Sequence, residues 1–190
     1  MQQFPDKNPG LAKKKTYFVE KIWSALSSLP QYNAEMINKY FTSGLIFEHY
    51  DFDMTIAEKC NPKIHTMRRK SKREWKKGTA IHYKIWTGKP YVEPTFAFAP
   101  TIPCDGTEAC SVIYPKIKGD YLPYVEIGER MIFQGSDEME LLAMNDGFDS
   151  VEDFFLYFDE SWDGEIIHWT PFRYDVNEID VKDPETIKAN

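Results

Sequence analysis

The N-terminal part of the chain carries apolar side chains at helical spacing. Between residues 11 and 29 they recur every three or four positions: Phe18, Ile22, Leu26 and Leu29. This pattern predicts an amphipathic helix over residues 11–29, which Pro30 ends. A second, shorter helix is predicted over residues 33–41, where Asn33 can cap the first turn. We expect the two helices to form an N-terminal extension, residues 1–44, that packs on the rest of the chain.

From residue 45 onward, alternation of apolar and polar residues replaces the helical spacing. In residues 79–86, two sets of side chains would face opposite sides: Ile81, Tyr83 and Ile85 on one, His82, Lys84 and Trp86 on the other. Further strands are predicted at residues 45–52, 95–99, 111–117 and 125–133. A turn at residues 87–90 and a proline-rich loop or edge at residues 100–106 separate some of them. Many short strands joined by turns are typical of a small β-barrel.

Two short helices are predicted after these strands. They cover residues 136–144 and 149–158. The second carries an apolar stripe at helical spacing: Val151, Phe154, Phe155 and Phe158. Asp149 and Glu152 form an acidic variant of a capping box at its start.

A final strand and a polar tail end the chain. After a turn at Asp163 and Gly164, a closing strand is predicted over residues 165–174. The order of helices, strands, two helices and a last strand predicts an α+β fold. We expect a β-barrel domain over residues 45–175 and a tail over residues 176–190.

Composition indicates a globular protein that is not exported. At 190 residues, 42% hydrophobic and 15% aromatic, the chain can bury a core within one domain. No apolar run approaches the ~18 residues of a membrane span, and no apolar signal core follows Met1. We therefore expect a cytoplasmic protein with no membrane partner. Three cysteines are too few for a disulfide framework, and without a nearby histidine they disfavour a zinc site.

Charge is distributed unevenly along the chain. The net charge of −7 argues against a general coat for duplex nucleic acid, because neutralising phosphates supplies much of the affinity of such proteins. Residues 63–77 contain eight Lys or Arg and one acid, whereas residues 134–165 contain eleven acids and no Lys or Arg. We expect a local positive patch on an acidic body. The run from Arg68 to Arg73 can contact phosphates, or it can be a solvated loop.

Residues 63–68, Lys-Ile-His-Thr-Met-Arg, hold the strongest candidate chemistry. From an extended or turning chain, Lys63, Thr66 and Arg68 can face one cavity. A threonine becomes a nucleophile when a neighbouring base takes its proton, and a lysine can be that base when burial lowers its pKa. Arg68 offers a planar fork for a phosphate, a carboxylate or a carbonyl oxygen. The same residues also suit a basic, solvated loop, so this pattern alone leaves both interpretations open.

Three segments together resemble the ASCH domain, a branch of the PUA-like superfamily of small β-barrels. Residues 63–68 look like the Lys-x-x-Thr-x-Arg segment of that family. Residues 75–81, Trp-Lys-Lys-Gly-Thr-Ala-Ile, are similar to its step from a lysine-glycine-aspartate turn into a strand. Residues 145–154, which begin Asn-Asp-Gly-Phe, are similar to its Glu-Gly-Phe segment and the amphipathic helix after it. The resemblance covers residues 45–174 and leaves the N-terminal helices outside.

The resemblance implies a pocket that takes a nucleobase, a modified nucleoside or a segment of RNA. Some family members are amidohydrolases that remove an acyl group from the exocyclic nitrogen of cytidine. They use a lysine as proton acceptor, a threonine as nucleophile and a glutamate as proton donor, and by motif position these roles fall on Lys63, Thr66 and Asp146. Aspartate is one methylene shorter than glutamate and has a lower ordinary pKa, so Asp146 disfavours catalysis and leaves ligand binding open.

Ligand-binding side chains are expected around this pocket. Arg68, Arg69 and Lys70 would hold phosphate, and Trp75 would stack on a base because its charged neighbours favour exposure. Four other aromatic residues can also stack but are more typical of a core: Trp86, Tyr91, Phe96 and Phe98. We expect His65 to point away from the pocket and to have a structural role. No glycine-rich phosphate loop or His-rich metal cluster is present, so we expect no cofactor.

These observations support two functions of different classes. The first hypothesis is a PUA-like module that binds nucleic acid, a nucleotide or a nucleoside, with RNA or a modified nucleoside as its partner. The alternative is an amidohydrolase that acts on an acylated cytidine. A third interpretation, in which the barrel is only a scaffold for protein interactions, stays open.

Overall fold

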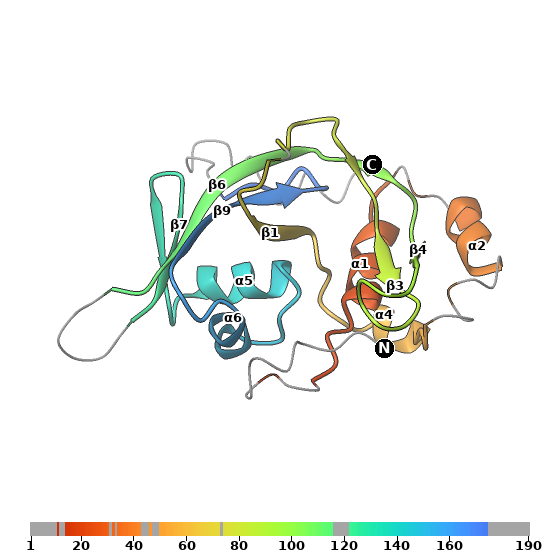
Figure 1. The fold of residues 1–190 in the computed structure, drawn as a ribbon, viewed down its shortest axis with the longest axis horizontal. Coiled ribbons are helices and arrows are strands. Elements are labelled where there is room, and N and C mark those ends of the chain that lie inside the picture. The colour runs from red at the N-terminus through yellow and green to blue at the C-terminus, as the bar shows by residue number, and fades with distance from the viewer. Residues whose placement is uncertain are drawn as a thin grey trace, which may run out of the picture.

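The computed structural model describes residues 11, 14–30, 32, 34–42, 46, 50–72, 74–115 and 122–174 of the 190. Figure 1 shows how their helices and strands are arranged. The helices are α1 (Phe18–Ser27), α2 (Ala34–Thr42), α4 (Met54–Ala57), α5 (Asp137–Asn145) and α6 (Val151–Tyr157). The strands are β1 (His65–Arg69), β2 (Ala80–Ile81), β3 (Lys84–Trp86), β4 (Thr95–Ala97), β5 (Ile102–Pro103), β6 (Gly106–Ile113), β7 (Tyr124–Ile127), β8 (Arg130–Phe133) and β9 (Trp162–His168). This mixture confirms the predicted α+β class.

One antiparallel sheet dominates the strands. It has five strands in the order β1-β9-β6-β7-β8, while β2 pairs with β5 and β3 pairs with β4 in two small sheets. In Figure 1, β6 and β9 arch over α5 and α6, and α1 lies toward the other end with β3 and β4. β1 and β8 form the two edges of the large sheet. The pairing between the described strands therefore leaves this sheet open, and it is not a closed barrel.

Strand β9 separates two hydrophobic cores because its side chains alternate. Ile166 packs in the first core, between the large sheet and helices α5 and α6. Ile167, the next residue, packs in the second core with α1 and the two small sheets. Helix α1 contributes Val19, Ile22, Trp23 and Leu26 to that second core. Helix α1, within the predicted N-terminal extension, thus packs on the rest of the chain and contributes to its second core.

The predicted helices are present, but their starts differ. Helix α1 begins at Phe18 instead of further upstream, where Tyr17 has a left-handed backbone with φ of 50°. The predicted capping box of α6 is wrong, because Ser150 caps the helix and accepts a hydrogen bond from the Asp153 amide at 3.1 Å. Asp149 therefore lies before the cap. The predicted stripe of this helix is buried: Val151, Phe154, Phe155 and Phe158.

Alternation predicted the faces of strands better than their lengths. Ile81, Tyr83 and Ile85 are buried, while His82, Lys84 and Trp86 are exposed, as predicted. Residues 125–133 were expected to form one strand, but β7 and β8 form a hairpin because Gly128 turns the chain with φ of 57°. Asp163 and Gly164 lie inside β9 and not in a turn. Phe52, at the end of the strand predicted over residues 45–52, is buried without strand structure.

Two further predictions concern the ends of the chain and the membrane. The polar tail predicted over residues 176–190 lies outside the described residues. Among the helices that the structure describes, none is long and apolar enough to cross a membrane.

Candidate functional site

A buried ion pair joins two of the sequence segments singled out above. Lys63 lies just before β1, and Asp146 lies at the C-terminal end of α5. The Nζ atom of Lys63 lies 2.8 Å from Oδ1 of Asp146, and the two side chains are only 6% and 5% exposed. Nζ also donates a hydrogen bond to the backbone carbonyl oxygen of Asp146. The lysine thus contacts both the side chain and the backbone of one residue.

The local sequence holds this pair in place. Gly147 follows Asp146 with φ of 92°, in the left-handed region that glycine adopts without strain. A Cβ atom at Gly147 would lie 2.9 Å from Cδ of Lys63 and 2.9 Å from a ring carbon of Phe18. The ring of Phe18 in turn lies 4.9 Å from Nζ of Lys63, within cation–π range. A larger residue at position 147 would therefore require Lys63 or Phe18 to shift.

Backbone hydrogen bonds fix the approach of the segment that carries Lys63. The amide of Lys63 donates to the carbonyl oxygen of Lys21 in α1 at 2.9 Å. The amide of Ile64 donates to the carbonyl oxygen of Asn145 in α5 at 3.0 Å. The segment is therefore tied to both cores immediately before it enters β1.

The carboxylate of Asp146 is held by three residues. Its Oδ1 atom accepts from Lys63 and from the backbone amide of Met67, the latter at 3.0 Å. The Nδ1 atom of His65 lies 3.6 Å from the same oxygen, too far for a hydrogen bond but close enough for electrostatic attraction. The side chains of Lys63 and His65 approach one carboxylate because alternate residues of an extended chain point to the same side, and Met67 contributes its backbone amide.

Burial and charge act in opposite directions on the pKa values of the pair. Burial lowers the pKa of Lys63, and the carboxylate of Asp146 opposes this shift. Burial also pushes the pKa of Asp146 upward, but the charge of Lys63 and the contact with His65 hold it below its ordinary value. Asp146 is therefore ionised at neutral pH and accepts hydrogen bonds. It would have to bind a proton before it could act as a proton donor.

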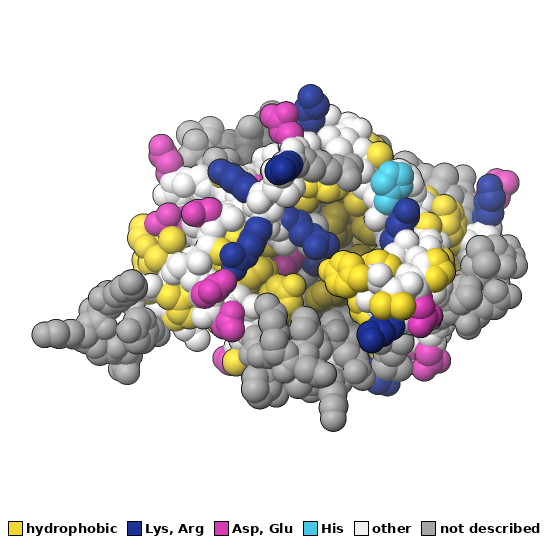
Figure 2. Space-filling model, viewed as in Figure 1, with side chains coloured by type: hydrophobic (Ala, Val, Ile, Leu, Met, Phe, Trp, Pro, Cys, Tyr) yellow, Lys and Arg dark blue, Asp and Glu magenta, His cyan; other side chains and the backbone are white. Residues whose placement is uncertain are grey.

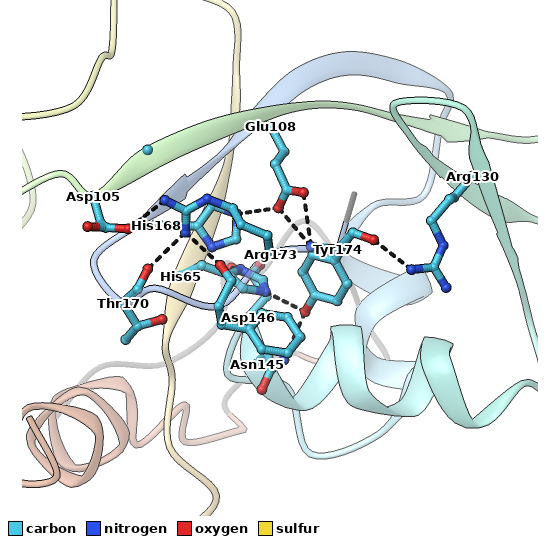
Figure 3. A network of polar contacts seen from close by, with 12 residues as sticks. His65, Asp105, Glu108, Arg130, Asn145, Asp146, His168, Thr170, Arg173 and Tyr174 are labelled. Atoms are coloured by element: carbon cyan, nitrogen blue, oxygen red, sulfur yellow. Dashed lines mark hydrogen bonds and ion pairs between the residues drawn. The ribbon is translucent and has the colours of Figure 1, made fainter. Parts of the chain in front are cut away.

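His65 connects the pair to a second buried group. Its Nε2 atom lies 2.8 Å from the hydroxyl of Tyr174, which also accepts a hydrogen bond from Nδ2 of Asn145 at 2.9 Å (Figure 3). Burial lowers the pKa of His65 to about 4, so the ring is neutral at pH 7. The hydroxyl proton of Tyr174 then points to Nε2, and the ring proton lies on Nδ1, facing Asp146. The expectation that His65 points away from Lys63 is wrong.

The C-terminal part of the described chain closes over this network. The amide of Tyr174 donates to both carboxylate oxygens of Glu108, at 2.9 and 3.2 Å, and Arg130 donates to the carbonyl oxygen of Tyr174 at 2.6 Å. Nε2 of His168 lies 2.6 Å from the same Glu108 carboxylate. Figure 3 shows these groups converging from β6, β9 and the segment after β9. Tyr174 is thereby fixed against His65.

Two other predicted site residues lie on the opposite side of β1. Thr66 and Arg68 alternate with His65 and Met67 and therefore face away from them. Thr66 is half-buried and pairs with Ile167, whose side chain lies in the second core. Its hydroxyl makes no hydrogen bond to any residue that the structure describes. The predicted nucleophile is thus not brought into contact with the lysine.

The predicted phosphate and base contacts have separate surroundings. Arg69 pairs with Glu160 at 2.5 Å on the exposed surface. Lys70 lines a cleft of about 320 Å³ on the large sheet, together with the acidic residues Glu126 and Asp163. Trp75 was expected to be exposed. It is instead half-buried against the second core.

A hollow is visible on one face of the molecule (Figure 2). Figure 2 shows it near the middle of that face, in the region that Figure 1 places between β1 and the strands β3 and β4. Hydrophobic side chains lie within the hollow, and Lys or Arg side chains border it. An apolar depression with a few charged groups at its border is typical of a small-molecule site.

No family model matches the chain, no curated protein matches it, and no solved structure matches it.

Proposed function

We propose that this chain is an ASCH-type, PUA-like module that binds a nucleobase in the hollow beside β1. The observation that carries the proposal is the buried pair of Lys63 and Asp146, whose carboxylate is held by three residues. Removing two charges from water is unfavourable by several kcal/mol per ion, and a buried pair often contributes no net stability. Retaining such a pair at a hollow favours a role in binding.

The pair offers a donor and an acceptor side by side. An ammonium group has three hydrogens, and Asp146 accepts two from Lys63, which leaves one. All hydrogen bonds of the Asp146 carboxylate to described residues involve Oδ1, which leaves Oδ2 as an acceptor. The base-pairing edge of cytosine presents an amino donor next to a ring-nitrogen acceptor, and Asp accepts from this amino group in known recognition. Cytosine therefore complements the pair with its amino group on Asp146 and its ring nitrogen on Lys63, whereas uracil presents its acceptor and its donor in the reverse order.

Calorimetric titration of cytidine, uridine and a short single-stranded RNA tests this function at low salt. We expect wild-type protein to bind cytidine more tightly than uridine. Asp146→Asn, which keeps the shape of the side chain, should weaken cytidine binding at least about tenfold, since a hydrogen bond to a charged group contributes about 1.5–3 kcal/mol. Lys63→Met should weaken it similarly, whereas the exposed Lys59→Ala serves as a control and should bind like wild type. If wild-type protein binds no nucleoside and no RNA, the proposed function is wrong.

A second candidate is hydrolysis of an N4-acylated cytidine, which the burial-lowered pKa of Lys63 favours. In this reaction the hydroxyl of Thr66, which faces away from Lys63 in the structure, would have to turn toward it, add to the acyl carbon and give its proton to Lys63. The C–N4 bond would break, the amine would leave with the proton that Lys63 had taken, and water would hydrolyse the resulting ester to the free acid and restore the Thr66 hydroxyl. This route needs Lys63 to be deprotonated, while the Asp146 carboxylate favours its protonated form. Binding is therefore the function better supported.

Incubation with N4-acetylcytidine separates the two candidates. Release of cytidine by wild-type protein, and its loss in Thr66→Ala, would establish hydrolysis. Binding of N4-acetylcytidine without release of cytidine would support nucleobase binding and exclude hydrolysis of this compound. Asp146→Glu should raise any turnover, since it restores the acid that the resemblance implies.

A further inference from the structure

The hairpin of β3 and β4 presents two aromatic rings to solvent. Tyr91 is 91% exposed and Trp86 is 36% exposed, and their ring centroids lie 5.2 Å apart. Phe98, by contrast, is buried in the second core. Large aromatic side chains usually lie inside a protein, so an adjacent exposed pair needs a reason.

The loop that carries Tyr91 is held stiffly. The amide and the hydroxyl of Thr87 both donate to the carbonyl oxygen of Pro94 at 3.0 Å, which closes the loop at its base. The amides of Val92 and Glu93 donate to the carbonyl oxygen of Lys89, at 3.2 and 3.1 Å. These bonds hold one conformation, so little freedom is lost if the ring contacts a ligand.

The backbone of Tyr91 is itself in an unfavourable region. Its φ is 63°, in the left-handed region that disfavours non-glycine residues by roughly 1–2 kcal/mol. Burial of the ring cannot offset this, because the side chain is almost fully exposed. Strain of this kind collects at binding sites, where it places a side chain for a ligand.

Basic side chains accompany the rings. Lys84 and Trp86 share the outer face of β3, because Ile85 between them points into the second core. Lys89 is exposed in the loop itself. The nearby acid, Glu93, accepts a hydrogen bond from the backbone amide of Lys89 at 3.2 Å and is engaged with the loop. Exposed rings beside ammonium groups suit a nucleic-acid strand, whose bases stack while its phosphates meet the cations.

We propose that Trp86 and Tyr91 form a stacking platform for a nucleotide next to the base held at Lys63 and Asp146. The hairpin lies on the border of the hollow (Figures 1 and 2). The ligand is therefore a single-stranded oligonucleotide of several nucleotides rather than a free nucleoside. This inference rests on the proposed function and specifies its substrate class.

Fluorescence anisotropy tests the platform with labelled single strands of about one, three, five and seven nucleotides. RNA and DNA strands of the same sequence are measured separately. Affinity should rise with length, and Tyr91→Ala and Trp86→Ala should each weaken binding of the longest strand at least about fivefold. Both variants should leave cytidine binding unchanged. Tyr91→Phe should retain full affinity, because stacking needs only the ring, and Val92→Ala, in the same loop, is the matched control. Circular dichroism confirms that each variant is folded.

The outcomes separate this inference from the function on which it rests. Cytidine binding with no gain on lengthening, or with no loss in Tyr91→Ala, would overturn the platform and leave the nucleoside site intact. Absence of binding to any nucleoside or strand would overturn both. A platform that binds RNA but not DNA would narrow the ligand to RNA and support the inference.

Discussion

Two halves of one basic segment behave differently in this protein. The first half, residues 63–67, enters the fold: Lys63, His65 and Met67 are buried, and the Lys63 ammonium and the Met67 amide both donate to Asp146. The second half, within residues 68–77, stays near the surface, where the arginines and lysines that the structure describes are exposed, and Arg69 pairs with an exposed acid. The sequence contains no sharp boundary between them, since basic residues occur in both.

The difference shows that a lysine's environment depends on its partner more than on its neighbours in sequence. Lys63 is buried because Asp146, 83 positions away, supplies a carboxylate and a carbonyl oxygen. Arg69 pairs with Glu160 across 91 positions, yet both side chains remain more than half exposed. A buried pair and an exposed pair should respond very differently to mutation, and the following experiments measure that difference.

The largest effect is expected from Asp146→Ala. This variant leaves the Lys63 ammonium buried without its partner, which typically lowers the free energy of unfolding by about 3–5 kcal/mol. Urea unfolding followed by circular dichroism measures the loss. Asp159→Ala is the matched control at an exposed aspartate, and it should change stability by less than about 0.5 kcal/mol. The double variant Lys63→Met with Asp146→Leu should recover most of the loss, because no unpaired charge remains.

A somewhat smaller effect is expected from the titration of His65. Its pKa is about 4 in the folded protein against 6.5 ordinarily. Between these values the unfolded chain binds a proton that the folded chain does not. The contribution of neutral His65 to the free energy of unfolding is therefore fully present above pH 6.5. It is lost as the pH falls to about 4, which lowers the free energy of unfolding by about 3 kcal/mol in total.

Comparison with His65→Asn isolates this contribution. Urea unfolding of both proteins between pH 7.5 and pH 4 (about this range) should show a difference that changes as the histidine titrates. Carboxyl groups away from His65 titrate in both proteins and cancel in the comparison, whereas Asp146, whose pKa Lys63 and His65 lower, titrates below its ordinary range. Parallel curves over the whole range would show that His65 is not held neutral by burial.

A third effect concerns the hydroxyl that His65 contacts. Tyr174→Phe removes the hydroxyl that accepts a hydrogen bond from Nδ2 of Asn145 and faces Nε2 of His65. These two buried nitrogen atoms then lose their contact with the hydroxyl. Leaving buried groups unsatisfied costs about 1–3 kcal/mol, so the unfolding free energy should fall by that order. The exposed Tyr91→Phe is the control and should have no measurable effect on stability. Equal stability of both variants would show that the Tyr174 hydroxyl contributes nothing.

The pattern of apolar and polar residues predicted helices and strands well where only one face of the element is buried. The alternation of Ile81, Tyr83 and Ile85 matches their burial, since a strand repeats every two residues. The hairpin of β7 and β8 was missed because apolar alternation continues through the turn, and only Gly128 marks it. The shape of the large sheet was also beyond local patterns, because strand order depends on contacts between distant segments.

The candidate site was predicted in part. Lys63 and Asp146 meet, as the resemblance implies, while their roles stay predictions. The two-residue period of an extended chain could have placed His65 beside Lys63, and Thr66 opposite, from sequence alone. The partners Tyr174, Glu108 and His168 carry no local motif, so only the fold brings them together.

The smallest effect is expected in the exposed half of the basic segment. Arg69 and Glu160 lie 2.5 Å apart, but their side chains are 62% and 68% exposed. Exposed pairs contribute about 0–1 kcal/mol, and salt screens them. A double-mutant cycle of Arg69→Ala and Glu160→Ala, measured by urea unfolding at low and high salt, should give a coupling energy below about 1 kcal/mol that falls with salt. A larger, salt-independent coupling would show that this half of the segment also stabilises the fold, and that the contrast with Lys63 is wrong.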